Sequence, residues 1–103
     1  MNDTSTPDIE HVETHGIGAF VIHKGTERIA EMLYRQVEDA ETPTIVIEHT
    51  KVDESLRGQG IARALLDRVV AWARANSVRV RATCPYAKAQ LDKDPSLHDV
   101  YDA

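Results

Sequence analysis

Arg57, Gly58, Gln59 and Gly60 stand directly before a run of apolar residues with helical spacing. The first four backbone N–H groups of a helix have no partner within the helix, and the helix dipole adds a partial positive charge at the same end. Such an end binds anions when no bulky side chain blocks the approach. Two of the chain's five glycines keep this approach open. The stretch therefore predicts an anion-binding loop, and the alternative is a tight strand-to-helix turn without a ligand.

The residues of this loop do not match the common nucleotide-binding loops. The loop lacks the Gly-Lys-Ser/Thr ending of a P-loop, and Arg63 stands where the dinucleotide fingerprint requires a third glycine. We therefore expect a ligand that carries phosphate but is not a nucleoside triphosphate. The charge distribution agrees with an anionic ligand, because residues 55–103 contain eight basic and five acidic residues, whereas residues 1–54 contain four basic and twelve acidic residues. A solvent-exposed charged helix surface would account for the same asymmetry.

Two side chains could transfer protons. His49 could act as a general base, because the ordinary pKa of histidine is about 6.5. It could equally be a buried residue on the strand face of Ile45 and Ile47. Tyr86 could donate a proton, or it could pack in the core with its hydroxyl in water. No metal site is predicted from the chain's histidines and acidic residues, which show no four-ligand pattern.

Cys84 is the single cysteine of the chain. Its thiolate could act as a nucleophile if Arg79, Arg81 or a helix start favoured the charged form. The alternative is small apolar packing on the strand face of Val80 and Ala82. A single cysteine cannot form an internal disulfide, which suits a reducing compartment.

Hydrophobic periodicity predicts the elements that carry these residues. Ile61, Leu65, Val69 and Trp72 recur at helical spacing and predict one long helix that ends near Asn76. A second, short helix is predicted over residues 86–94. Period-two and β-branched runs predict strands over residues 9–15, 18–24, 28–37, 44–52 and 78–84, with turn-forming Gly16 and Gly18 between the first two. The long helix between two strands indicates a βαβ unit within a mainly antiparallel, mixed sheet.

Length and composition limit the domain organisation and the partners. With 103 residues, 42% of them hydrophobic, we expect one domain over residues 9–103 and a disordered polar tail over residues 1–8. No apolar run approaches the roughly 20 residues of a membrane helix. The net charge of −5 argues against nucleic acid as the main partner. These features predict a cytoplasmic protein that binds neither membrane nor nucleic acid, as a monomer or weak homodimer.

The loop resembles that of the GNAT superfamily of N-acetyltransferases, whose acetyl-CoA loop reads R/Q-x-x-G-x-G/A. Residues Arg57–Ala62 match this pattern completely. In particular, the chain is similar to the short, single-domain branch, in which an "HTEV"-like strand end precedes the loop and a cysteine follows the next strand. "HTKV" at His49–Val52 and "TCPY" at Thr83–Tyr86 occupy these places, and the resemblance extends from about residue 28 to residue 95.

The resemblance implies a GNAT-like α/β (α+β) fold and a site for acetyl-CoA. Backbone amides of the loop would hold the CoA pyrophosphate, and the pantetheine arm would run beside the strand that ends in Val52. With acetyl-CoA bound, Tyr86 could protonate the leaving CoA thiolate, and the resemblance makes Cys84 a candidate acetyl carrier. The cofactor-binding residues implied are Val52, Arg57, Gly58, Gln59, Gly60, Ile61, Ala62 and Arg63.

Two residues depart from the pattern of the branch. Lys51 replaces an acidic residue and Ala82 replaces a proline, although neither lies in the loop. We expect an acetyl-CoA-dependent N-acetyltransferase acting on a primary amine, either a small molecule or a protein lysine. The alternatives are a CoA-binding module without catalysis and an interaction domain whose glycine loop is purely structural. Direct transfer to the amine is preferred to transfer through Cys84, because it needs only the positioning of two bound reactants.

Overall fold

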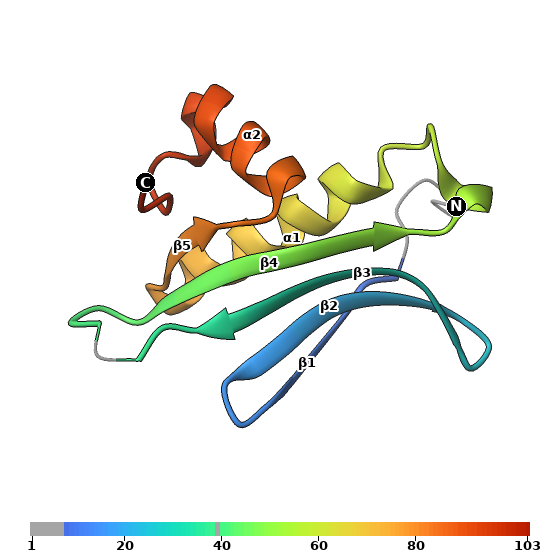
Figure 1. Cartoon of the computed structure of the whole chain (residues 1–103), viewed down its shortest axis with the longest axis horizontal. Coiled ribbons are helices and arrows are strands. Elements are labelled where there is room, and N and C mark those ends of the chain that lie inside the picture. The colour runs from blue at the N-terminus through green and yellow to red at the C-terminus, as the bar shows by residue number, and fades with distance from the viewer. Residues whose placement is uncertain (1–7, 39) are drawn as a thin grey trace.

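The computed structural model describes residues 8–38 and 40–103. One sheet of five strands in the order β1-β2-β3-β4-β5 carries the long helix α1 along one face, and the shorter helix α2 follows β5 (Figure 1). The predicted tail, residues 1–8, lies outside the described residues except for Asp8. The elements are β1 Glu10–Thr14, β2 Ile17–Lys24, β3 Glu27–Gln36, β4 Thr44–Val52, α1 Ile61–Asn76, β5 Arg79–Ala82 and α2 Pro85–Lys93.

The strands β1 to β4 form an antiparallel meander and β5 pairs with β4 in parallel, which confirms the predicted mainly antiparallel, mixed sheet. His15 and Gly16 connect β1 to β2 with φ values of 54° and 80°, the two positive values that a type I′ hairpin turn requires. The prediction that Gly18 belongs to this turn was wrong. Gly18 lies within β2, where an added Cβ would stand 2.3 Å from the Tyr34 ring.

The core lies between α1 and one face of the sheet. Leu65, Leu66, Val69 and Val70 are buried at the spacing that the sequence predicted, and they pack against buried side chains of β2, β3 and β4. Helix α1 ends where Ser77 adopts a left-handed conformation, one residue past Asn76. No helix among the described residues has both the length and the apolar character needed to cross a membrane.

A bulge interrupts the pairing of β3 with β4. Leu33 lies opposite His49, whereas Tyr34, the next residue of β3, lies opposite Ile47, so Glu48 has no residue opposite it. Side chains alternate between the two faces of a strand, and one extra residue reverses the alternation beyond it. The part of β4 after Glu48 therefore turns different side chains toward α1 than an uninterrupted strand would.

Strands β4 and β5 pair only along part of β4. Their register runs from Thr44 opposite Arg79 to Ile47 opposite Ala82, and β4 continues to Val52 without a partner on this side among the described residues. The chain leaves β5 where the N–H groups of residues 83 and 84 both donate to the Ile47 carbonyl, at 2.9 and 3.1 Å. The second edge of residues 48–52 is therefore available to another extended chain or a ligand.

Candidate active site

A loop connects residues 48–52 of β4, the part that does not pair with β5 and is called the free part of β4 below, to the start of the long helix α1. Its glycines Gly58 and Gly60 have φ values of 80° and 73°, and Gly60 is the residue that caps α1. Ala64 donates the first backbone hydrogen bond of the helix, to the Gly60 carbonyl at 3.0 Å, so the N–H groups of residues 61–63 precede the helical ladder. The loop therefore exposes a helix end with unpaired donors, as an anion site requires.

Glycine is needed in this loop for its backbone conformation, because left-handed φ values are costly for most residues. The surroundings are also open. An added Cβ at Gly58 or at Gly60 would meet no other atom within 4 Å. The space in front of the helix end is thus free for a ligand, although the turn alone would already account for the glycines.

A hollow of about 250 Å³ lies at this loop. It gathers residues from the end of β4, the loop, the first turn of α1 and the start of α2. Seven of the eight predicted cofactor-binding residues line it, together with Tyr86 and one residue that sequence reasoning missed, Leu56. Its lining residues are Val52, Leu56, Arg57, Gly58, Gly60, Ile61, Ala62, Arg63 and Tyr86. The eighth, Gln59, donates its side-chain amide to the Ser55 carbonyl at 3.2 Å and so braces the loop.

The two arginines of the hollow have different roles. Arg63 donates to Asp67 at 2.8 Å, to Gln90 at 2.8 Å and to Asp94 at 2.5 Å, which ties the first turn of α1 to α2. Hydrogen bonds from this guanidinium, and next from Ser96, lower the pKa of Asp94 to about 2. Arg57 takes part in none of the ion pairs formed by residues 8–38 and 40–103. Arg57 is therefore the side chain available to an anion.

Of the six remaining basic residues of the second half, Arg74, Arg81 and Lys88 form ion pairs within the chain, and Arg79 donates to two backbone carbonyls. Arg74 forms two hydrogen bonds to Asp99, at 2.7 and 2.9 Å, and Arg81 donates to Asp102 at 2.9 Å. These pairs hold the C-terminal segment against α1 and β5. These ion pairs account for part of the positive charge of residues 55–103, whereas the attraction of an anionic ligand stays a prediction.

Cys84 lies beyond β5 as the residue that precedes α2, and only 3% of its surface is exposed. Its sulfur lies 3.2 Å from the Thr50 hydroxyl oxygen, and either atom can donate. Sequence reasoning missed Thr50, because an uninterrupted β4 would direct His49 toward the face of Ile45 and Ile47. The bulge at residue 48 places Thr50, and not His49, on this face.

His49 is exposed and does not line the loop hollow. The bulge directs it to the face of β4 opposite α1, so it does not share a face with Ile45 and Ile47. The structure therefore separates the proton-transfer candidates. Tyr86 lies on the side of the loop, and His49 lies on the other side of β4.

Tyr86 is half-buried at the start of α2 and lines the loop hollow. Burial raises its pKa above the ordinary value of 10.0, against the opposing effect of the positive charge of Arg63. The phenol is therefore protonated near neutral pH. A protonated phenol in the hollow can donate a hydrogen bond or a proton to a ligand there.

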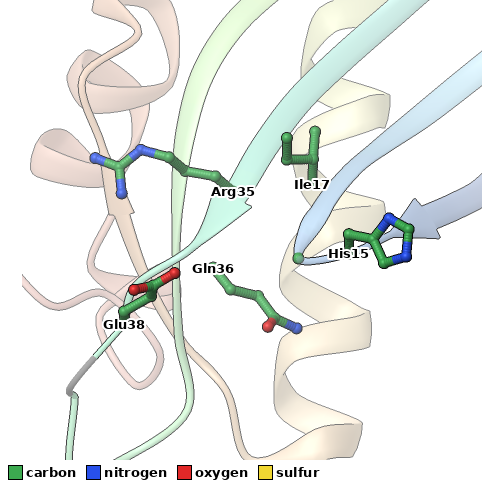
Figure 2. Close-up of a pocket in the computed structure, with 6 residues that line it drawn as sticks. His15, Ile17, Arg35, Gln36 and Glu38 are labelled. Carbon is green, nitrogen blue, oxygen red and sulfur yellow. The ribbon is translucent and has the colours of Figure 1, made fainter.

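A larger hollow, of about 510 Å³, lies at the opposite end of the sheet. Figure 2 shows its lining side chains at the β1–β2 turn and the end of β3, among them His15, Ile17, Arg35 and Glu38. Gln36 of this hollow pairs with Ile45 near the start of β4, whereas the loop follows the end of β4. The larger hollow contains none of the predicted site residues.

Comparison with known proteins identifies the family. A model of the GCN5-related N-acetyl-transferase family matches residues 19–100. The chain is 33% identical to a GCN5-like N-acetyltransferase candidate from Staphylococcus aureus, whose solution structure it matches with a TM-score of 0.67 over 97% of this chain and 92% of that protein. A search of the curated proteins gives no match.

More distant structures share the fold. A ribosomal-protein-alanine N-acetyltransferase from Brucella melitensis is 17% identical and matches with a TM-score of 0.61 over 87% of this chain and 64% of that protein. An aminoglycoside acetyltransferase from an uncultured soil metagenomic sample is 16% identical and matches with a TM-score of 0.58 over 69% of this chain and 47% of that protein. The family match over most of its length and the similarity to the staphylococcal protein show that the chain belongs to the GCN5-related N-acetyltransferase family.

Proposed function

We propose that this protein is an acetyl-CoA-dependent N-acetyltransferase that acts on a primary amine. The observation that carries the proposal is the hollow at the loop, where the glycines, the first turn of α1, Val52 and Tyr86 meet. The backbone N–H groups at residues 58–63 would bind the CoA pyrophosphate, and Arg57 would add a positive charge beside it. Family membership supports acetyl transfer to nitrogen.

The free edge of β4 would hold the pantetheine arm. Residues 48–52 have β3 on one side and no β5 partner on the other. The amide groups of pantetheine can hydrogen-bond to such an edge as an added strand would. This path leads from Val52 at the loop toward Ile47, where β4 and β5 part, and places the thioester near Thr50.

His49 and Tyr86 are the proposed proton carriers. The neutral amine nitrogen attacks the thioester carbonyl carbon, the C–S bond breaks and an amide forms. His49, on the face opposite α1, would take the proton that the amine loses. Tyr86 would donate a proton to the departing CoA thiolate from the loop side. The two groups act from opposite sides of β4, so the amine would approach the thioester from the side of His49 and the thiolate would leave on the side of Tyr86.

Direct transfer to the amine remains the preferred route. Cys84 is nearly fully buried and lies outside the lining of the loop hollow. A thiol in this position packs against the core and bonds to Thr50. Acetylation of Cys84 would require a nearly buried sulfur to reach the thioester, whereas direct transfer needs only the two bound reactants.

The proposed acceptor is a primary amine of a small molecule or of a protein lysine. The acidic first half of the chain suits a cationic acceptor, since its electrostatic field attracts positive charge. The exposure of His49 also favours a second candidate, a CoA-binding module without catalysis. A base in open water lacks the enclosure that assists acyl transfer.

An amine screen tests the proposal. Free CoA thiol would be measured with acetyl-CoA and a polyamine, an amino sugar or a lysine peptide in turn. Amine-dependent thiol release above the rate without protein is the expected result. CoA-dependent stabilisation without release for any amine would favour the CoA-binding module. The absence of both release and stabilisation would contradict both candidates.

A further inference from the structure

The exposed large apolar side chains of the described residues lie together on the first hairpin. They are Val12 in β1, which is 42% exposed, and Ile17 in β2, which is 67% exposed. Thr14 lies opposite Ile17, and Val12 stands two residues before Thr14, so all three side chains are on one face of the sheet. Figure 2 shows Ile17 standing apart from the other labelled side chains at this corner.

Strand β1 is the outer strand of the sheet within residues 8–38 and 40–103. Natural edge strands are usually protected by short length, by charged side chains such as lysine, by proline or by a bulge. The strand Glu10–Thr14, with the sequence EHVET, contains no proline or lysine, and its pairing with β2 is regular. Four of its five residues are exposed. Within the part of the chain that the structure describes, no strand pairs with this edge, so another strand can add to it.

We propose that a second copy of this chain docks on the edge, with the two β1 strands antiparallel about a two-fold axis at Val12. The sheets of the two copies would then form one continuous sheet of ten strands. Each copy contributes the same strand, as an isologous interface requires. The pairing involves only the edge of β1, so it leaves the loop between β4 and α1 accessible and does not depend on the proposed function.

The hairpin geometry limits the possible registers. In a two-residue type I′ hairpin the residues that flank the turn, Thr14 and Ile17, form a hydrogen-bonded pair. Alternation along β1 then directs the N–H and C=O groups of Val12 toward β2 and those of His11 and Glu13 outward. A two-fold axis can therefore lie at any residue of β1 but not between two residues, and axes at His11, Val12 and Glu13 pair the most residues.

The charge of Glu13 and the number of paired residues both favour the axis at Val12. An axis at Glu13 would place two carboxylates directly opposite each other, which is destabilising. An axis at His11 would leave Glu13 unpaired with any residue of the partner's β1. With the axis at Val12 all five residues of β1 have partners: His11 lies opposite Glu13 of the partner subunit, and Glu10 lies opposite Thr14 of the partner subunit. The two exposed valines then cover each other.

Cysteine cross-linking tests this register. In a Cys84→Ala background, Val12→Cys would place two Cα atoms about 4.5 Å apart in a non-hydrogen-bonded pair, within the range of a disulfide. Glu10→Cys is the matched control, because its two copies would lie four residues apart, about 13 Å. Mild oxidation should yield a disulfide-linked dimer with Val12→Cys only. No dimer with Val12→Cys, or equal dimer with Glu10→Cys, would overturn the proposal.

Sedimentation equilibrium tests the association without cysteines. Wild type should shift from monomer toward dimer between about 0.01 and about 1 mM, the range of a weak complex. Val12→Lys should stay monomeric because two ammonium groups would meet at the axis, whereas Val12→Thr, which keeps a β-branched side chain, should still associate. A wild-type protein that remains monomeric at about 1 mM would contradict the proposal, as would a Val12→Lys variant that still dimerises.

Discussion

The Thr50 hydroxyl and the Cys84 sulfur lie 3.2 Å apart and connect the free part of β4 to the start of α2. The contact spans the region in which β4 and β5 part. It exists because the bulge at Glu48 directs Thr50, and not His49, toward the core. Cys84 is thus part of the wall beside the proposed path of the pantetheine arm.

Removal of the sulfur should distinguish the two routes of acetyl transfer. Because Cys84 is buried, we expect direct transfer, so Cys84→Ala should retain most of the amine-dependent turnover. Intact-mass spectrometry of wild type with acetyl-CoA alone should show no acetyl adduct. An adduct on Cys84 that an added amine discharges would establish the route through cysteine.

Thr50→Val is the matched variant for this contact. Valine keeps the branched shape and removes the hydroxyl, so the packing beside Cys84 is nearly unchanged. Under direct transfer, Thr50→Val and Cys84→Ala should both leave turnover within a few-fold of wild type. A large loss in both variants, without a change in melting temperature, would show that the pair takes part in the chemistry.

His49→Ala should slow turnover by about 10², the typical contribution of a general base. The affinity for CoA should not change, since His49 lies outside the loop hollow. Steady-state kinetics and calorimetry of CoA binding would measure the two effects separately. Lys51→Ala, an exposed neighbour in β4, serves as the control. Equal effects of both substitutions would remove the base role from His49.

Arg57→Ala and Arg63→Ala should have different effects. Arg57 forms no ion pair with the described residues, so its removal should weaken CoA binding at low salt and leave the melting temperature unchanged. Arg63 ties α1 to α2, so its removal should lower the melting temperature of the free protein. Thermal unfolding and calorimetry at two salt concentrations would compare them. The reverse pattern would show that Arg63, and not Arg57, contacts the phosphates.

Stability should fall at alkaline pH because of Tyr34. Burial, together with the negative charge of Glu13, raises the pKa of Tyr34 to about 12 from 10.0. A group whose pKa is higher in the folded state stabilises fully below its unfolded pKa, and the stabilisation is lost as the pH rises from 10 toward 12. The melting temperature of wild type should therefore fall more steeply over this interval than that of Tyr34→Phe. Parallel curves would contradict this assignment.

Stability should also fall at acidic pH, because of His11. Burial lowers its pKa below 6.5, against the opposing charge of Glu13. The contribution of His11 to the free energy of unfolding is complete above pH 6.5. It is lost as the pH falls through the lowered pKa of the folded state, because the unfolded state then binds more protons. The melting temperature of wild type should fall below pH 6.5 more than that of His11→Phe. An equal fall in both proteins would assign the effect to other groups.

Gly60→Asn should weaken CoA binding without unfolding the protein. Asparagine tolerates the left-handed conformation that Gly60 adopts at a φ of 73°, and its side chain would fill the open space before the helix end. Gly25→Asn is the matched control, since Gly25 has a φ of 64°, similar open surroundings and a position in the β2–β3 turn. In thermal unfolding, CoA should stabilise Gly25→Asn and not Gly60→Asn. Equal stabilisation of both would show that the loop does not hold the ligand.

Much of the fold could be predicted from the sequence, because its apolar residues recur with a clear helical or strand period. The spacing of Ile61, Leu65 and Val69 predicted α1 and its buried face, and the β-branched run 44–52 predicted β4. The loop residues also lie together as the motif implied, since they are adjacent in the chain and precede a helix. Local pattern suffices for such features.

The bulge in β4 could not be predicted, because nothing in residues 44–52 marks where one residue is left unpaired. It decides which of His49 and Thr50 meets Cys84. The role of Arg63 in joining α1 to α2 could not be predicted either, because it depends on contacts distant in the sequence. Its partners Gln90 and Asp94 lie 27 and 31 residues away, and only the tertiary packing of α1 against α2 brings them together.

Binding of CoA at the loop is the central claim, and a titration followed by amide chemical shifts tests it most directly. Addition of CoA to the ¹⁵N-labelled protein should shift the signals of residues 58–63 most strongly, followed by those near Val52, because the pyrophosphate would accept hydrogen bonds from the loop amides. Unchanged loop signals at millimolar CoA, or changes confined to the hollow at His15 and Arg35, would contradict the account.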